Sequence, residues 1–246
     1  MKKFGNNNKK SVSNLVYGRI PALNSLTTDK VKKVYLQEGF NDKKIIETIK
    51  DKHLNPIFLP SFKINDMASG GNHQGIIVEV KDYNYSSLEE IICSAKGKKQ
   101  PLVLILDGVE DPHNFGAIIR CADAFSVDGI VIKERGQALV TPTVAKVSTG
   151  AIDFVKIAKV SNLSNAISKL KENGYWVYAA DGSGKEDYHK VKYDGPVALV
   201  VGSEGFGISK LVLENSDFVI KIPMTGNVNS LNVSVATGIL LSRIKN

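Results

Sequence analysis

Beyond residue 100, apolar residues gather in continuous runs of four or five, and segments with helical spacing separate these runs. Strands that are apolar throughout are buried on both faces, whereas half-exposed strands alternate apolar and polar residues. The pattern therefore predicts an α/β domain over 101–246, with a parallel sheet covered by helices on both sides. The predicted strands are residues 102–106, 129–132, 176–180, 197–201 and 218–222.

The first hundred residues are patterned differently. Over 15–82 shorter apolar runs alternate with helical patterns, which predicts a second, smaller α/β unit. Residues 83–100 are polar and end in a Lys-rich stretch, so we expect a linker there, with a short helix over 88–95. Residues 1–14 are rich in Asn and Lys and are predicted to be a disordered basic tail.

Charge and composition narrow the classes of function. The net charge is +7, and the first 100 residues carry all of the excess, with 17 Lys and Arg against 10 Asp and Glu. Such an excess favours a phosphate-rich partner such as RNA. The two cysteines form no CxxC pair, and no apolar run reaches the ~20 residues of a membrane span. We expect a cytoplasmic protein with no membrane partner, no disulfide framework and no metal site.

Three segments at strand ends carry the candidate chemistry. They read DGVEDPHNFGAIIR (107–120), VVGSEGFGIS (200–209) and IPMTGNVNSLNVSVA (222–236). Taken singly, each has an ordinary structural interpretation. In the first, Asn114 could cap a helix and Arg120 would point away from its apolar face. In the second, the glycines could form a turn or let backbone amides approach a nucleotide. In the third, Ser230 could cap the last helix.

In this order the three segments resemble the motifs of the SpoU (TrmH-like) family of RNA 2′-O-methyltransferases, of the SPOUT class. The resemblance implies a C-terminal SPOUT domain with a trefoil knot, preceded by a small ribosomal-protein-like RNA-binding domain over 15–82. It also implies S-adenosylmethionine as cofactor, RNA as substrate and a homodimer formed through the knotted domain. The two-domain architecture resembles most closely the bacterial branch that methylates a guanosine of 23S rRNA.

Residue by residue, the family pattern assigns two sets of positions. The catalytic set is Asn114, Arg120, Glu204, Ser230 and Asn232. The set around S-adenosylmethionine is Gly202, Gly207, Ile222, Met224 and Leu231. The family gives proton abstraction to the arginine at the position of Arg120. Because a guanidinium has a pKa above about 12, we hypothesise that Arg120 instead holds the RNA phosphate.

Alternatives remain open at this point. Methylation of tRNA belongs to the same enzyme class, and a non-catalytic RNA-binding or ribosome-assembly factor could share the fold. The joint presence of all five catalytic-set residues argues against such a factor. A polar loop that includes His73 and Gln74 could contact RNA, or could be a simple glycine turn.

Overall fold

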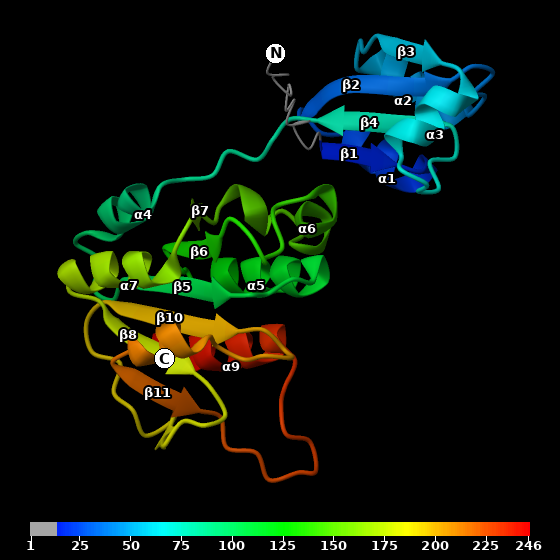
Figure 1. Ribbon diagram of the computed structural model, residues 1–246. Coiled ribbons are helices and arrows are strands. Elements are labelled where there is room, and N and C mark those ends of the chain that lie inside the picture. The colour runs from blue at the N-terminus through cyan, green and yellow to red at the C-terminus, as the bar shows by residue number, and fades with distance from the viewer. Residues whose placement is uncertain (1–13) are drawn as a thin grey trace, which may run out of the picture. The chain divides into compact units, whose positions relative to one another are not determined.

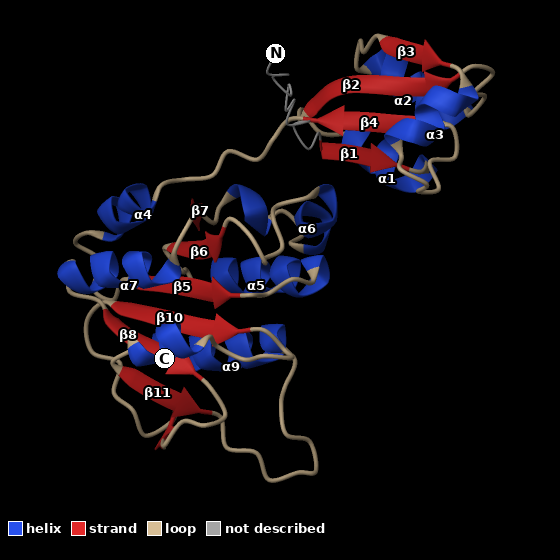
Figure 2. Cartoon of the chain, in the orientation of Figure 1, coloured by secondary structure: helices blue, strands red, loops and turns tan. Residues whose placement is uncertain are grey.

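The computed structural model describes residues 14–246, which form two compact units, one ending at Tyr83 and the other beginning at Asn84. Each unit has its own sheet and its own hydrophobic core (Figures 1 and 2). The predicted tail lies outside the described residues except for Asn14, which begins the first strand.

The first unit is a four-stranded sheet in the order β1-β4-β2-β3. Strand β4 is antiparallel to β1 and β2, whereas β3 is parallel to β2. Side chains of α1 and α2 form the main core on one face, and Ile64 of α3 packs with Ile77 on the other. The elements are β1 (Asn14–Tyr17), α1 (Arg19–Leu26), β2 (Val31–Gln37), α2 (Lys43–Asp51), β3 (Pro56–Leu59), α3 (Ser61–Met67) and β4 (Ile76–Val80).

The second unit contains a seven-stranded sheet in the order β7-β6-β5-β10-β8-β11-β9, and all its neighbouring strands are parallel. The predicted parallel α/β fold is thereby confirmed. The elements are α4 (Leu88–Ala95), β5 (Leu102–Asp107), α5 (Pro112–Ala124), β6 (Gly129–Lys133), α6 (Pro142–Val147), the 3-10 turn η1 (Ala151–Asp153), β7 (Ile157–Val160), α7 (Leu163–Glu172), β8 (Trp176–Ala180), β9 (Glu186–Asp187), β10 (Val197–Gly202), α8 (Lys210–Glu214), β11 (Phe218–Lys221) and α9 (Val233–Lys245).

Helices cover both faces of this sheet. Val103 and Ile105 of β5 pack in one core with side chains of α4, α7 and α8. Because successive strand residues point to opposite faces, Leu104 and Leu106 face the other layer, where α5 packs against both α6 and α9. All six residues of β5 are buried, as the continuous apolar pattern predicts. The trefoil knot implied by the family resemblance stays a prediction.

The short helix expected over 88–95 is present as α4. The surrounding segment, residues 83–100, differs from a simple linker, because Ile91 of this helix is fully buried in the core of the second unit. Ser87 caps the helix and forms a capping box with Glu90, which fixes where the helix begins. The polar residues of α4 itself, Glu89, Glu90 and Ser94, are exposed and lie on the outer side of this packed helix.

Candidate active site

The three sequence segments meet where the strand order of the large sheet reverses. From β5 the chain adds β6 and β7 on one side, whereas β10, β8 and β11 lie on the other. Asp107 and Gly202 end the neighbouring strands β5 and β10 and are paired in register. Carboxyl ends of parallel strands at such a reversal are where α/β proteins usually bind ligands.

Three side chains of the predicted catalytic set are joined by hydrogen bonds. The Asn114 amide donates to Glu204 Oε1 at 3.1 Å, and the Asn232 amide donates to Asn114 Oδ1 at 2.8 Å and to Glu204 Oε1 at 2.6 Å. The Val233 backbone N–H donates to the same Glu204 oxygen at 3.4 Å. We call Asn114, Glu204 and Asn232 the amide–carboxylate triad. A single carboxylate thus connects helix α5, the glycine loop after β10 and the start of α9.

The glycine loop, residues 202–209, is folded tightly on itself. Ser203 and Gly207 exchange two backbone hydrogen bonds of 3.1 and 3.0 Å, and Gly207 has a φ of 66°. A Cβ added at Gly202 would lie 2.2 Å from the Gly207 carbonyl carbon, so only glycine fits there. The tip is open, since Phe206 is 97% exposed. The loop is therefore fixed at its base and accessible at its tip.

Two carboxylates hold the base of this loop. The Ser209 N–H donates to Asp107 Oδ2 at 2.8 Å, and Lys133 Nζ lies 2.7 Å from Asp107 Oδ1. Burial would raise the pKa of Asp107, but the hydrogen bonds from Lys133 and Ser209 outweigh it and hold that pKa below its usual value. The pKa of Asp181 is lowered in the same way: hydrogen bonds from Ser183 and the Ile208 backbone outweigh burial. Residues at the ends of β5 and β8 therefore set the position of the loop.

Arg120 and Ser230 lie apart from the triad. Arg120 is exposed six residues beyond Asn114 on α5, about 9 Å along the helix axis, and forms no hydrogen bond or ion pair with any described residue. Ser230 is exposed in the loop between β11 and α9 and also has no partner among residues 14–246. The structure thus joins three of the five predicted catalytic residues and leaves two with free side chains.

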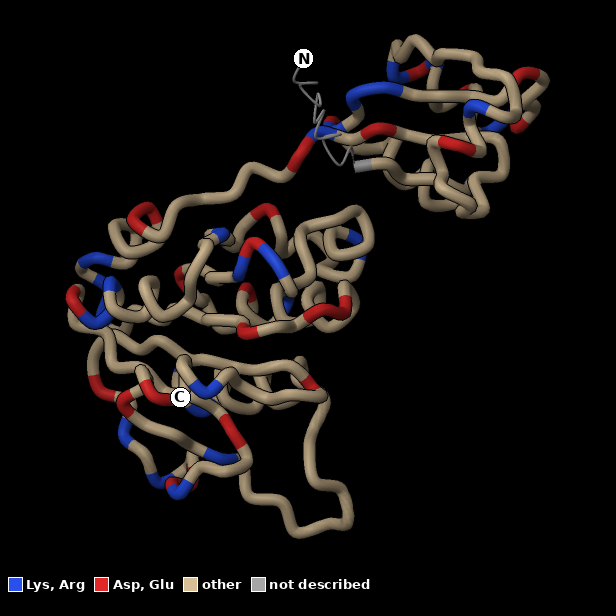
Figure 3. Tube along the Cα trace, in the orientation of Figure 1, with Lys and Arg blue, Asp and Glu red and all other residues tan. Residues whose placement is uncertain are grey.

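The residues predicted to surround the cofactor lie on two loops. Gly202 and Gly207 belong to the glycine loop, and Ile222, Met224 and Leu231 belong to the loop between β11 and α9. That second loop carries no charged residue (Figure 3). None of its peptide groups from 222 to 231 forms a backbone hydrogen bond with another described residue. These donors and acceptors remain free for a ligand.

Two helix starts differ from the sequence interpretation. Asp111, not Asn114, caps α5: its carboxylate accepts the His113 N–H at 2.8 Å, and Pro112 occupies the first helical position. Asn114 is consequently buried in the first turn of α5, where its side-chain amide donates to Glu204. Asn232, not Ser230, caps α9 through its Oδ1. Asn232 therefore caps α9 with its side-chain oxygen and donates to the other two members of the triad with its side-chain nitrogen.

Several residues near the site were not predicted. Besides Asp107, Lys133 and Asp181, Gln137 accepts the N–H groups of Gly108 and Val109 through Oε1, each at 3.0 Å. Its Nε2 is buried and has no partner in the described chain. These roles carry weak sequence signals because most partners are backbone groups distant in sequence. The strand-terminal position of Asp107 is the one signal that could have been used.

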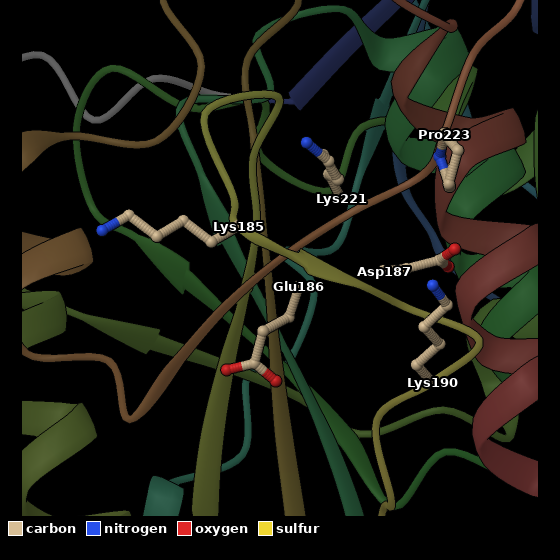
Figure 4. A pocket seen from close by; sticks show the side chains of 6 residues that line it. All are labelled: Lys185, Glu186, Asp187, Lys190, Lys221 and Pro223. Atoms are coloured by element: carbon tan, nitrogen blue, oxygen red, sulfur yellow. The ribbon is translucent and has the colours of Figure 1, made fainter.

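A charged pocket lies where β9 pairs with β11 and the chain enters the uncharged loop. It is lined by three lysines, two carboxylates and a proline: Lys185, Lys190, Lys221, Glu186, Asp187 and Pro223 (Figure 4). Within residues 14–246, no group of three or more His, Cys, Asp or Glu is arranged to hold a metal ion. No described helix is long and apolar enough to cross a membrane.

Comparison with known families agrees with this arrangement. Residues 101–242 match the SpoU rRNA Methylase family, and residues 15–86 match a domain described as RNA 2'-O ribose methyltransferase substrate binding. A relative from Staphylococcus haemolyticus, assigned to the TrmH family of tRNA/rRNA methyltransferases, is 43% identical over 87% of this chain and 87% of its own length.

Solved structures show the same fold. An RNA methyltransferase of the TrmH family from Porphyromonas gingivalis is 27% identical, with a TM-score of 0.64 over 95% of this chain and 89% of its own. The SpoU methyltransferase AviRb from Streptomyces viridochromogenes, in complex with AdoMet, is 20% identical, with a TM-score of 0.66 over 94% and 88%. The family match spans more than half of the chain, and the chain belongs to the SpoU/TrmH family of RNA methyltransferases.

Proposed function

We propose that this protein transfers a methyl group from S-adenosylmethionine to a ribose 2′-oxygen of RNA. The observation that carries the proposal is the amide–carboxylate triad at the reversal point of the sheet, where three separate family motifs are joined by hydrogen bonds. A protein that bound RNA without catalysis would need neither this convergence nor the unpaired side chains of Arg120, on the same helix as Asn114, and Ser230, in the loop before α9.

The residues present fit the cofactor. The uncharged loop has unpaired peptide groups, and the base of the glycine loop allows close backbone approach. We assign the binding of S-adenosylmethionine to Gly202, Gly207, Ile222, Met224 and Leu231. When bound, the sulfonium supplies an activated methyl group. The protein contributes by holding the acceptor oxygen in line at about 3 Å.

The side chains divide this work. Arg120, exposed and unpaired, binds the phosphate of the target nucleotide and thereby fixes its ribose. Ser230 orients the ribose hydroxyl, while Asn114, Glu204 and Asn232 hold the surrounding loops in register through their mutual hydrogen bonds. With a pKa above about 12, the guanidinium is a poor base, so the phosphate or a water molecule accepts the hydroxyl proton.

The preferred substrate is a guanosine of 23S rRNA. Support comes from the two-unit architecture, in which a substrate-binding domain precedes the methylase domain. Methylation of tRNA is the second candidate, because the Staphylococcus haemolyticus relative is described as acting on tRNA or rRNA. We also propose that the second unit forms a homodimer through α9, whose Val235 is 51% exposed and whose Ile239 is half-buried.

Methyl transfer from labelled S-adenosylmethionine to 23S rRNA and tRNA transcripts tests the function. We expect label on 23S rRNA, with one phosphodiester bond becoming resistant to alkaline cleavage. Arg120→Ala should reduce the rate at least about a hundredfold. The matched control is Lys156→Ala, an exposed cation that lies outside the three motif segments and precedes the edge strand β7.

Each result has a definite meaning. Label on tRNA alone would replace the rRNA assignment with the tRNA one. Tight RNA binding without label on either transcript would contradict the proposal that the protein is a methyltransferase. Near wild-type transfer by Arg120→Ala would remove any essential role for that side chain.

A further inference from the structure

We propose that a cleft in the first unit binds one unpaired nucleotide of the RNA substrate, a specificity element that rests on the proposed function. The cleft is lined by Arg19, Gln37, Phe40, Asn41, Asn72 and Gln74, with the exposed carboxylate Glu38 also in its lining, and we call it the amide cleft. Three loops form it: the turn after β1, the turn after β2 and the loop before β4.

Hydrogen bonds and close packing hold the loops of the amide cleft together. The Arg19 backbone N–H donates to Gln74 Oε1 at 2.8 Å, and the Gly18 N–H donates to the His73 carbonyl at 3.3 Å. A Cβ added at Gly75 would lie 2.8 Å from the Phe40 ring, so the loop before β4 packs directly on that ring. The cleft therefore exists before any ligand binds.

Hydrogen bonds to both ring nitrogens also fix the orientation and tautomer of the His73 side chain. Its Nδ1 accepts the Gly75 N–H at 3.0 Å, so Nε2 carries the proton and donates to Asn65 Oδ1 at 2.6 Å. The next residue, Gln74, has a φ of 49°, a left-handed conformation that costs free energy for a non-glycine residue. Strain of this kind persists where surrounding contacts impose it, and it is common at binding sites.

The polar groups of the amide cleft suit a nucleobase. Asn41 and Asn72 are exposed, and their amides have no partner among the described residues; Gln74 uses only its oxygen. A side-chain amide offers a donor beside an acceptor, the pattern that base edges present. Two such amides and the Gln74 nitrogen surround one cleft, so the chemistry indicates base reading.

Arg19 completes the site. Its guanidinium lies 5.9 Å from the centre of the Phe40 ring and 3.6 Å from Asp42, and its side chain remains 53% exposed. A guanidinium fixed against an aromatic ring can stack on a base or bind the adjoining phosphate. In a duplex the bases are stacked and paired, so the cleft accepts a base only from a loop, bulge or end.

Charge distribution favours base reading over phosphate binding in this unit. Residues 15–82 contain ten Lys and Arg against eight Asp and Glu, so most of the basic excess lies elsewhere in the chain. Both signs are interspersed over the first unit (Figure 3). A nearly neutral unit gains little affinity from released counterions and must use hydrogen bonds and stacking.

Binding of the full chain to a fluorescent 23S rRNA transcript tests the proposal. We expect the double variant Asn41→Ala/Asn72→Ala to weaken binding at least about fivefold. The matched control is Asn24→Ala/Asn55→Ala, which removes two exposed amides of the same unit outside the cleft. Melting temperatures of both variants establish that the unit is folded.

The outcomes separate this proposal from the proposed function. Equal affinity of the two double variants, or competition by a fully paired RNA duplex as strong as by a single-stranded oligonucleotide, would overturn the amide cleft. Methyl transfer by the wild-type chain is measured on the same transcript. If methyl transfer is absent but the cleft variant selectively loses RNA binding, the proposed methyltransferase activity is refuted and the proposed role of the amide cleft is supported.

Discussion

The Asp107 carboxylate accepts the backbone N–H of Ser209 at 2.8 Å, although 102 residues separate them in the chain. This hydrogen bond joins the end of β5 to the end of the glycine loop. The same carboxylate binds Lys133 of β6 through its other oxygen. One buried side chain thus ties together three segments at the reversal point of the sheet.

Replacing this carboxylate changes how stability depends on pH. The folded-state pKa of Asp107 lies below its usual value, so its contribution is present above that value and is lost as pH falls through the folded pKa. We expect Asp107→Asn to lower the free energy of unfolding at pH 7 by roughly 1–3 kcal/mol. Urea unfolding at pH 7 and at about pH 2, below the usual pKa of an Asp, should show a smaller loss on acidification than in the wild type. An unchanged difference between the two pH values would contradict this role.

Gly202 should tolerate no side chain. In Gly202→Ala the new Cβ would meet the Gly207 carbonyl and the Ile208 nitrogen at 2.5 Å or less. These are backbone atoms that cannot rotate away, so we expect a cost of at least about 2 kcal/mol and weaker binding of S-adenosylmethionine. Gly205→Ala is the matched control, because nothing lies within 4 Å of its added Cβ. Calorimetry of both variants decides the point, and equal stability would argue against the tight loop.

Glu204 should contribute to methyl transfer indirectly, by accepting hydrogen bonds from the side-chain amides of Asn114 and Asn232. Removing its carboxylate in Glu204→Ala leaves the donors of Asn114, Asn232 and Val233 without their shared acceptor. We expect kcat/KM for RNA to fall roughly tenfold to a hundredfold, with Glu204→Gln retaining part of the activity. Glu172→Ala, an exposed carboxylate on α7, should leave turnover unchanged. Wild-type kinetics in Glu204→Ala would mean that the triad is only structural.

The two roles of Asn232 can be separated by one substitution. Serine is also a good helix N-cap, so Asn232→Ser keeps an acceptor for the Ser234 N–H but removes the amide that contacts Asn114 and Glu204. We expect a change in unfolding free energy below about 1 kcal/mol together with a clear loss of methyl transfer. Thermal melting and turnover are measured on the same preparation. A large loss of stability with normal turnover per folded molecule would refute the assignment.

The sequence predicted the buried strands well because burial on both faces leaves a continuous apolar run. Two strands, β7 and β9, were not predicted from the sequence. Strand β7 has four residues and includes the exposed Lys159, and β9 consists of only Glu186 and Asp187. Both lie at edges of the sheet, where pairing uses backbone groups and places little demand on side chains.

The candidate site was predictable in position more than in detail. Motifs at strand ends located it, and the exposed direction of Arg120 followed from helical spacing. The cap of α5 was misassigned because Asp111 and Asn114 are both good capping residues, although Pro112 between them indicates the earlier one. The hydrogen bond from Ser209 to Asp107 could not be predicted, since a backbone donor leaves no trace in residue type.

The position of Asn232 has a consequence for folding. The amide–carboxylate triad needs a residue that caps α9, and α9 packs against α5, which lies more than a hundred residues earlier in the chain. Contacts between such distant segments require a long loop of chain to close. The three side chains can therefore meet only after α5 and α9 have packed together, and anything that separates these two helices takes the triad apart while leaving each helix intact.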